Sequence, residues 1–120
     1  SDPTVVSLRF TNVALPEVQA EFPWDAPTSE NPLTLVMWAH ADAKDVAEAH
    51  VLALDAEIEE YEAFMIAQPS SRFEEPTIDL VKSNFGDRVE IREGLNGNAS
   101  VISTKKAQRI LGWRPRYDWR

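Results

Sequence analysis

The segment at residues 4–13 constrains the fold most, because it reads as a hydrophobic strand that needs partners. Val6, Leu8 and Phe10 alternate with Val5, Ser7 and Arg9, and β-branched residues are dense at its start. This pattern predicts a strand that is largely buried on both sides where it begins. An apolar strand with open edges is unstable as a monomer, so we expect other segments beside it.

Further apolar runs predict more strands. Residues 33–41 and 61–67 each form such a run, and residues 89–91 form a shorter one. Runs of this length fit strands better than helices.

Three helices are expected between and after these strands. The first begins at Asp45, whose carboxylate can cap it. The second spans residues 76–85, with a proline in its first turn and a glycine after its end. Ser103 or Thr104 caps the third, which runs through Leu111.

Residues 14–33 contain four prolines and no clean period, which predicts a long loop with one short helical turn at residues 17–21. Loops of this length in a compact domain are often functional. Trp24 is therefore the best aromatic candidate for stacking on a ligand. The alternative is that this ring anchors a core, as large aromatic side chains commonly do.

The order of elements predicts an α/β fold with parallel crossover units. In this arrangement the strands at residues 4–13 and 61–67 are parallel neighbours, joined by the helix that begins at Asp45. A chain of 120 residues corresponds to one domain.

The charge of the chain bears on its partners. Asp and Glu number 20 against 12 Lys and Arg, a net charge of −8, which argues against nucleic acids and anionic membranes. No apolar run is long enough to span a membrane, and there are no cysteines. The polar, acidic start Ser1-Asp2-Pro3 is unlike a signal peptide, so none is expected. A cytoplasmic location is expected. The basic stretch at residues 95–120 either binds an anion or attracts the acidic remainder of the chain.

Catalytic and metal-binding signatures are not evident. Neither a G-x-G-x-x-G motif nor a P-loop occurs, so no dinucleotide or catalytic site is expected within this chain. His40 and His50 lie near acidic residues, but Glu48 and His50 stand about 200° apart on a helix and cannot converge on a metal. The acidic cluster around residues 57–62 is interpreted as a solvated connector.

Three motifs carry a resemblance. Residues 8–13 read L-R-F-T-N-V, residues 40–49 read H-A-D-A-K-D-V-A-E-A, and residues 103–115 read S-T-K-K-A-Q-R-I-L-G-W-R-P. In order, they resemble the L-R-x-x-N-V strand, the V-x-D-V-A-x-A helix start and the closing S-K-A-x-x-x-L-G-W-x-P segment of extended short-chain dehydrogenases/reductases. These enzymes are NAD-dependent epimerases and dehydratases, many of which act on nucleotide sugars.

The matched motifs belong to the C-terminal half of that family. The resemblance therefore implies that residues 1–120 are the substrate-binding portion of a longer Rossmann-like enzyme, with a few parallel main-sheet strands plus small mixed strands and helices. The dinucleotide-binding domain would lie upstream. NAD or NADP would bind only the parent enzyme, and this fragment alone would be inactive and hold no cofactor.

The resemblance also implies a substrate site. Asn12 matches the asparagine that contacts a nucleotide sugar near its diphosphate. Independently of the resemblance, Arg72, in the loop after the strand at residues 61–67, is a further candidate for a phosphate. The family's Y-G-P is A-L-P here, and Trp38 stands where an arginine often grips a phosphate. A related hydroxyl or carbonyl compound is thus another expected substrate.

Two alternatives remain at this point. In the first, the chain is a free-standing, non-catalytic binding or interaction module of the same fold. In the second, it is an acidic metal-binding hydrolase. If it is a fragment, its uncovered surfaces predict self-association.

Overall fold

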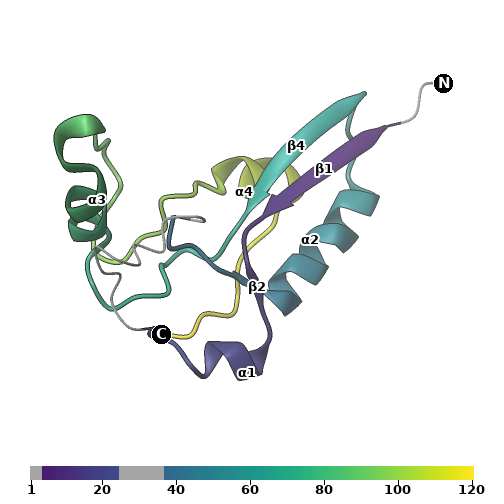
Figure 1. The fold of residues 1–120 in the computed structure, drawn as a ribbon. Coiled ribbons are helices and arrows are strands. Elements are labelled where there is room, and N and C mark those ends of the chain that lie inside the picture. Colours follow the sequence, from purple (N-terminus) through teal and green to yellow (C-terminus); the bar gives the residue numbers. More distant parts are fainter. Residues whose placement is uncertain (1–3, 25–36) are drawn as a thin grey trace.

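Two parallel strands form the framework of the fold in the computed structural model, which describes residues 4–24 and 37–120 (Figure 1). Strand β1 (Val5–Phe10) pairs with β4 (Tyr61–Ile66), from Val5 opposite Tyr61 to Phe10 opposite Ile66. Helix α2 (Ala43–Asp55) lies in the chain between them and packs beside β1. The predicted parallel pairing of these strands is therefore confirmed, and the described fold is mixed α/β.

Helix α2 begins earlier than the sequence suggested. Its N-cap is Asp42, whose Oδ1 accepts hydrogen bonds from the backbone N–H groups of Lys44 (2.8 Å) and Asp45 (3.2 Å). The prediction of Asp45 as the cap was wrong, because Asp42 has the extended backbone that an N-cap requires. Asp45 instead lies buried in the first turn.

The strand predicted at residues 33–41 is also corrected. Its first part lies outside the described residues, and the rest is a turn followed by the two-residue strand β3 (Ala41–Asp42). Met37 and Trp38 have φ values of 50° and 63°, in the left-handed region that interrupts a strand. Strand β3 pairs in parallel with β2 (Val13–Ala14). The single strand predicted at residues 4–13 is therefore divided into β1 and β2, which have different partners.

The helices match the predictions more closely. A short helix α1 (Pro16–Gln19) follows β2. Helix α3 (Thr77–Phe85) ends at the 3-10 turn η1 (Gly86–Arg88), and α4 (Lys105–Leu111) ends at Gly112 with a φ of 71°. Residues 89–91 form no strand, which corrects the remaining strand prediction: the chain bends at Val89, and the stretch has no ladder partner among the described residues.

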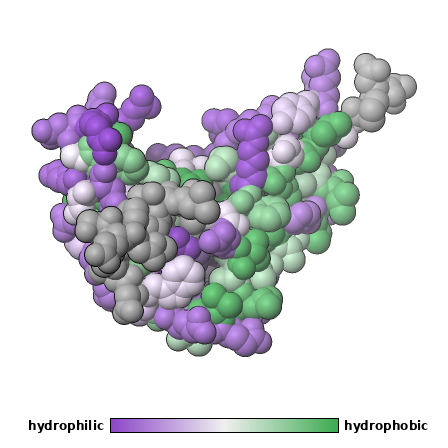
Figure 2. All heavy atoms as spheres, in the orientation of Figure 1, coloured by the Kyte–Doolittle hydropathy of each residue, from purple (hydrophilic) through white to green (hydrophobic). Residues whose placement is uncertain are grey.

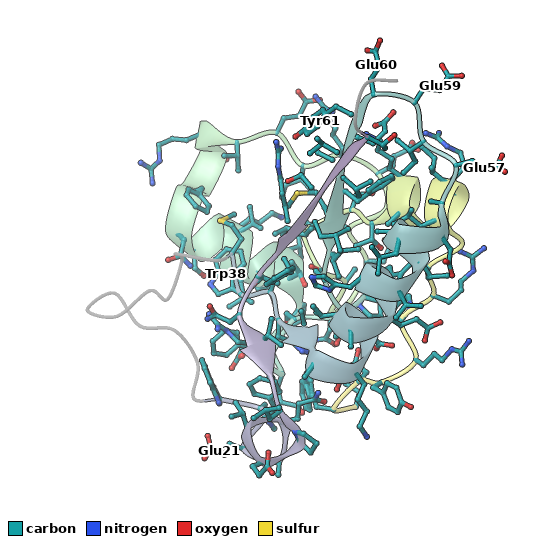
Figure 3. All side chains as sticks on the ribbon, turned by 90° about the vertical axis from the view of Figure 1, so that its right-hand side faces the viewer. Glu21, Trp38, Glu57, Glu59, Glu60 and Tyr61 are labelled. Atoms are coloured by element: carbon teal, nitrogen blue, oxygen red, sulfur yellow. The ribbon has the colours of Figure 1, made fainter. Side chains whose placement is uncertain are left out.

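A core fills one face of the β1–β4 sheet. Side chains from β1 and β4 pack there against α2, α4 and the segment that follows α4; the buried members are Ala41, Val46, Ala49, Phe64, Ile66, Ala107, Leu111 and Trp113. A second cluster surrounds α3, with Trp38, Phe73, Leu80 and Val81 at its centre. Figure 3 shows Trp38 beside α3, and Glu57, Glu59 and Glu60 pointing away from the ribbon, as predicted for a solvated connector. Glu62 departs from that prediction, because it lies within β4 and forms an ion pair with Lys106.

The opposite face of the sheet is largely uncovered, so the prediction that β1 is buried on both sides where it begins was wrong. Val5 and Tyr61 are each 53% exposed and Met65 is 40% exposed, although all three are large and apolar. Each strand also has one edge without a strand partner among the described residues. The covered face is also incompletely filled: Figure 2 shows hydrophobic side chains gathered over β1 and α2, and a groove of about 600 Å³ runs there between Val6 and Leu8 of β1 and the second half of α2. Parallel sheets are normally covered on both faces, so this sheet has surfaces suited to further contacts.

These surfaces lead to a prediction about association. At tens of micromolar, the chain should form dimers or larger species in size-exclusion chromatography with light scattering. Burial of 500 Å² of apolar surface contributes about 12 kcal/mol before the costs of association. Val5→Lys should shift the population toward the 13.5 kDa monomer, whereas Val89→Lys, exposed and away from the sheet, should not. A wild-type chain that is wholly monomeric would contradict the prediction.

Candidate functional site

The carboxyl ends of β1 and β4 meet across the segment at residues 38–42. The peptide between His40 and Ala41 joins them: its N–H donates to the Asn12 carbonyl (2.9 Å) and its C=O accepts from the Gln68 N–H (2.8 Å). The Trp38 carbonyl accepts from the Arg72 N–H at 3.1 Å. Ligands of open α/β sheets bind beyond the carboxyl ends of the strands, which makes this region the candidate site.

Gln68 is a fully buried connection between these segments. Its Oε1 accepts from the Asp42 N–H (2.7 Å), and its Nε2 donates to Asp45 Oδ2 (2.7 Å) and to the Tyr117 carbonyl. Both ends of the amide are therefore satisfied, and Gln68 has a structural role.

Asp45 fastens the C-terminal tail, residues 113–120, to α2. Its carboxylate accepts from the backbone N–H groups of Arg116 and Tyr117 at 3.0 Å each. Its backbone carbonyl accepts from the buried Trp113 Nε1 at 2.9 Å. Asp45 is 1% exposed, and its oxygens are occupied by these donors and by Gln68, so it holds the fold together.

The tail then enters the candidate site. The Ser70 hydroxyl donates to Asp118, at 3.0 Å from Oδ1 and 2.7 Å from Oδ2. Trp119 Nε1 donates to the Ser71 carbonyl at 2.9 Å, and Arg120 donates to the Phe73 carbonyl. Asp118 and Arg120 were not singled out from the sequence, where the basic character of the C-terminal stretch was the only signal.

Arg72 and Trp24 are in contact, which no motif or spacing in the sequence predicted. The Arg72 guanidinium carbon stands 4.6 Å from the centre of the Trp24 ring and 5.7 Å from that of Phe73. The Trp24 N–H also donates to the Arg72 carbonyl at 3.2 Å. The two residues thus form one unit, in which the indole covers the guanidinium.

The Arg72 guanidinium is buried without a counter-ion. Arg72 is 3% exposed, and within the described residues its guanidinium makes no ion pair or hydrogen bond, with Nε fully enclosed. Burial lowers the pKa of Arg72. A desolvated cation–π contact contributes about 2 kcal/mol, whereas burial of an ion costs several kcal/mol. The stabilisation from stacking is therefore smaller than the free-energy cost of burying this charge.

His40 lies nearby in an aromatic cluster centred on Phe22. The two ring centres are 5.2 Å apart, and neither ring nitrogen of His40 has a hydrogen-bond partner among the described residues. Its Nε2 is 3.8 Å from Asp118 Oδ1, which is too long for a hydrogen bond. Burial is the main cause that lowers the pKa of His40; Asp118 opposes the shift and Arg72 reinforces it. The ring is therefore neutral at pH 7.

Asn12 stands on the other side of the segment at residues 38–42. It is exposed, and its side-chain amide makes no hydrogen bond in the described part of the chain; its own N–H instead donates to the Thr11 hydroxyl. The amide is open to a ligand and does not end the strand by bonding its own backbone. The structure brings Arg72 and Trp24 together and leaves Asn12 apart from them.

Other features bear on ligands of different kinds. Among the described residues, no three His, Asp or Glu side chains converge to form a metal site, and no helix is both long and apolar enough to cross a membrane. A cleft of about 300 Å³ opens next to Asp118 and is lined also by Asp42, Lys44 and Arg116.

Comparisons with protein-family models, with curated proteins and with solved structures found no match to this chain.

The role of Asp45 can be tested by Asp45→Asn. The amide places an NH₂ group against backbone donors, so the free energy of unfolding should fall by about 1–3 kcal/mol. Urea unfolding measures this loss, and trypsin should cleave faster at Arg116. Asp55→Asn, which removes the same charge from the exposed end of α2, serves as the control. Equal stability of the Asp45 and Asp55 variants would contradict the assigned role.

The buried neutral His40 leads to a pH prediction. Because its pKa in the folded state is below the ordinary value of 6.5, the unfolded chain binds the proton more readily. The contribution of the neutral His40 ring to the free energy of unfolding is therefore complete above about pH 6.5, and it is lost as the pH falls below that value.

Urea unfolding at about pH 7.5 and pH 5.5 gives the free energy of unfolding at each pH. This free energy should fall more steeply with decreasing pH for the wild type than for His40→Gln, and the two slopes should differ by at most about 1.4 kcal/mol per pH unit. His50→Gln, at an exposed position, should retain the wild-type slope. If His40→Gln also retains it, His40 is not held neutral by burial.

Proposed function

We propose that this chain is the substrate-binding, C-terminal part of an NAD(P)-dependent epimerase or dehydratase of the extended short-chain dehydrogenase/reductase family. Its substrate would be a nucleotide sugar or a related hydroxyl or carbonyl compound. The observation that carries the proposal is the parallel β1–α2–β4 unit, which has one covered face and candidate binding residues beyond its carboxyl ends.

The incomplete covering of the sheet supports this proposal. A two-stranded sheet is marginal by itself, and parallel sheets occur with both faces covered. Val5, Tyr61 and Met65 are the apolar residues that additional helices or strands would cover. In the proposed parent enzyme, the upstream half supplies these elements and completes a Rossmann-like sheet.

The residues of this chain do not fit a dinucleotide. Its four glycines, at positions 86, 94, 97 and 112, lie in turns and helix ends late in the chain, and none forms a phosphate-binding turn after a strand. The nicotinamide of the parent would supply hydride transfer. This chain would bind and orient the substrate through Asn12, Trp24 and Arg72, and no catalytic acid or base is assigned to it.

Reading the coding sequence upstream, in the same frame, tests the proposal. A glycine-rich turn after a first strand, followed by Tyr-x-x-x-Lys, is the expected result. A stop codon or an unrelated domain directly upstream would overturn the proposal and favour the free-standing binding module.

Asn12 allows a functional test in the parent enzyme. Asn12→Ala should lower kcat/KM by about tenfold to a hundredfold, because a hydrogen bond to a charged substrate group contributes about 1.5–3 kcal/mol. Asn96→Ala is the matched control, since that asparagine is also exposed and its side chain makes no hydrogen bond in the described part of the chain. An unchanged kcat/KM in a folded Asn12 variant would show that Asn12 does not contact the substrate.

A further inference from the structure

Two arginine–tryptophan pairs flank Phe22 in the candidate site. Arg72 stacks on Trp24, and the Arg120 guanidinium carbon lies 4.2 Å from the centre of the Trp119 ring. Both indoles contact Phe22, with ring centres 5.3 and 6.1 Å from it. The site therefore combines flat apolar walls with two cations.

The two arginines differ in how their charges are accommodated. Arg120 donates to the Phe73 carbonyl, whereas the Arg72 guanidinium has no hydrogen-bond acceptor among the described residues. The two carboxylates that act on the neighbouring His40 are committed elsewhere: Asp118 accepts from Ser70, and Asp42 accepts from the N-terminus of α2 and from Gln19. Arg72 is thus a buried donor group that lacks an acceptor.

The charges around Arg72 indicate which kind of anion would pair with it. A guanidinium presents a planar set of N–H groups that matches a carboxylate or phosphate in a bidentate manner. One unpaired guanidinium balances one negative charge. Besides Arg72, the charges that act on the neighbouring His40 are the carboxylates of Asp118 and Asp42 and the cation of Arg120. The two carboxylates outnumber that one cation, so a dianion would be repelled more than a monoanion.

We infer that Arg72 binds a carboxylate of the substrate, with Trp24 holding the guanidinium plane. This inference rests on the proposed function and narrows it: the substrate is a hydroxy or oxo acid, and its carboxylate is anchored at Arg72. The neutral His40 ring, whose nitrogens have no hydrogen-bond partner among the described residues, provides an additional polar group close to the anchored acid.

Titration with acetate and with inorganic phosphate tests this assignment on the 120-residue chain at constant ionic strength. The readout is the NMR signal of the Arg72 Nε–H group. Acetate should shift this signal with a Kd of the order of millimolar, an affinity that a ligand of four heavy atoms can reach. Phosphate should bind at least about tenfold more weakly, because of the two nearby carboxylates.

Variants separate Arg72 from general charge effects. Arg72→Gln should weaken acetate binding by at least about tenfold, measured by the acetate-dependent rise in Tm. Arg92→Gln removes the same charge at an exposed site and should leave that rise unchanged. Because Arg72→Gln is a buried substitution, the wild-type Nε–H titration decides the question if this variant does not fold.

The outcomes distinguish this inference from the proposed function. Tighter binding of phosphate than of acetate would overturn the assignment of a carboxylate. An Nε–H signal that responds to neither anion would overturn the anion site as a whole. Both results are independent of the upstream coding sequence, which alone decides whether the chain belongs to an NAD(P)-dependent enzyme.

Discussion

The buried carboxylate of Asp45 is the interaction on which the rest of the structure depends. It accepts hydrogen bonds from Gln68 Nε2 and from the backbone N–H groups of Arg116 and Tyr117. Three segments that are distant in sequence therefore meet at one residue: the start of α2, the chain beyond β4 and the C-terminal tail. Since a buried carboxylate is stable only when donors satisfy it, these segments fold around it as a unit.

The candidate site is a consequence of this arrangement. With the tail fixed at Tyr117, Asp118 reaches Ser70, and Trp119 and Arg120 reach the chain beyond β4. Arg72 then lies among aromatic rings without a counter-ion among the described residues. A buried charge without a counter-ion destabilises the fold. A ligand of opposite charge relieves this destabilisation when it binds, so such a charge favours ligand binding.

The sequence predicted local structure well where a single segment determines it. The parallel partnership of β1 and β4 followed from their apolar runs and the intervening helix, and α3 and α4 followed from their proline, threonine and glycine boundaries. The strand predicted up to residue 41 failed because Met37 and Trp38 adopt positive φ, which residues of these types rarely do. The contact between Trp24 and Arg72 could not be predicted, because it depends on how two loops fold against each other.

Hydrogen exchange of the β1 backbone amides tests the central claim that this sheet belongs to a larger one. Exchange would be compared, at concentrations where both are monomeric, between the 120-residue chain and the protein encoded by the complete reading frame. The account predicts that the N–H groups on the open edge of β1 exchange at least about a hundredfold more slowly in the complete protein, because they gain strand partners. Equal exchange rates would contradict the account and show that β1 is an edge strand of a self-sufficient fold.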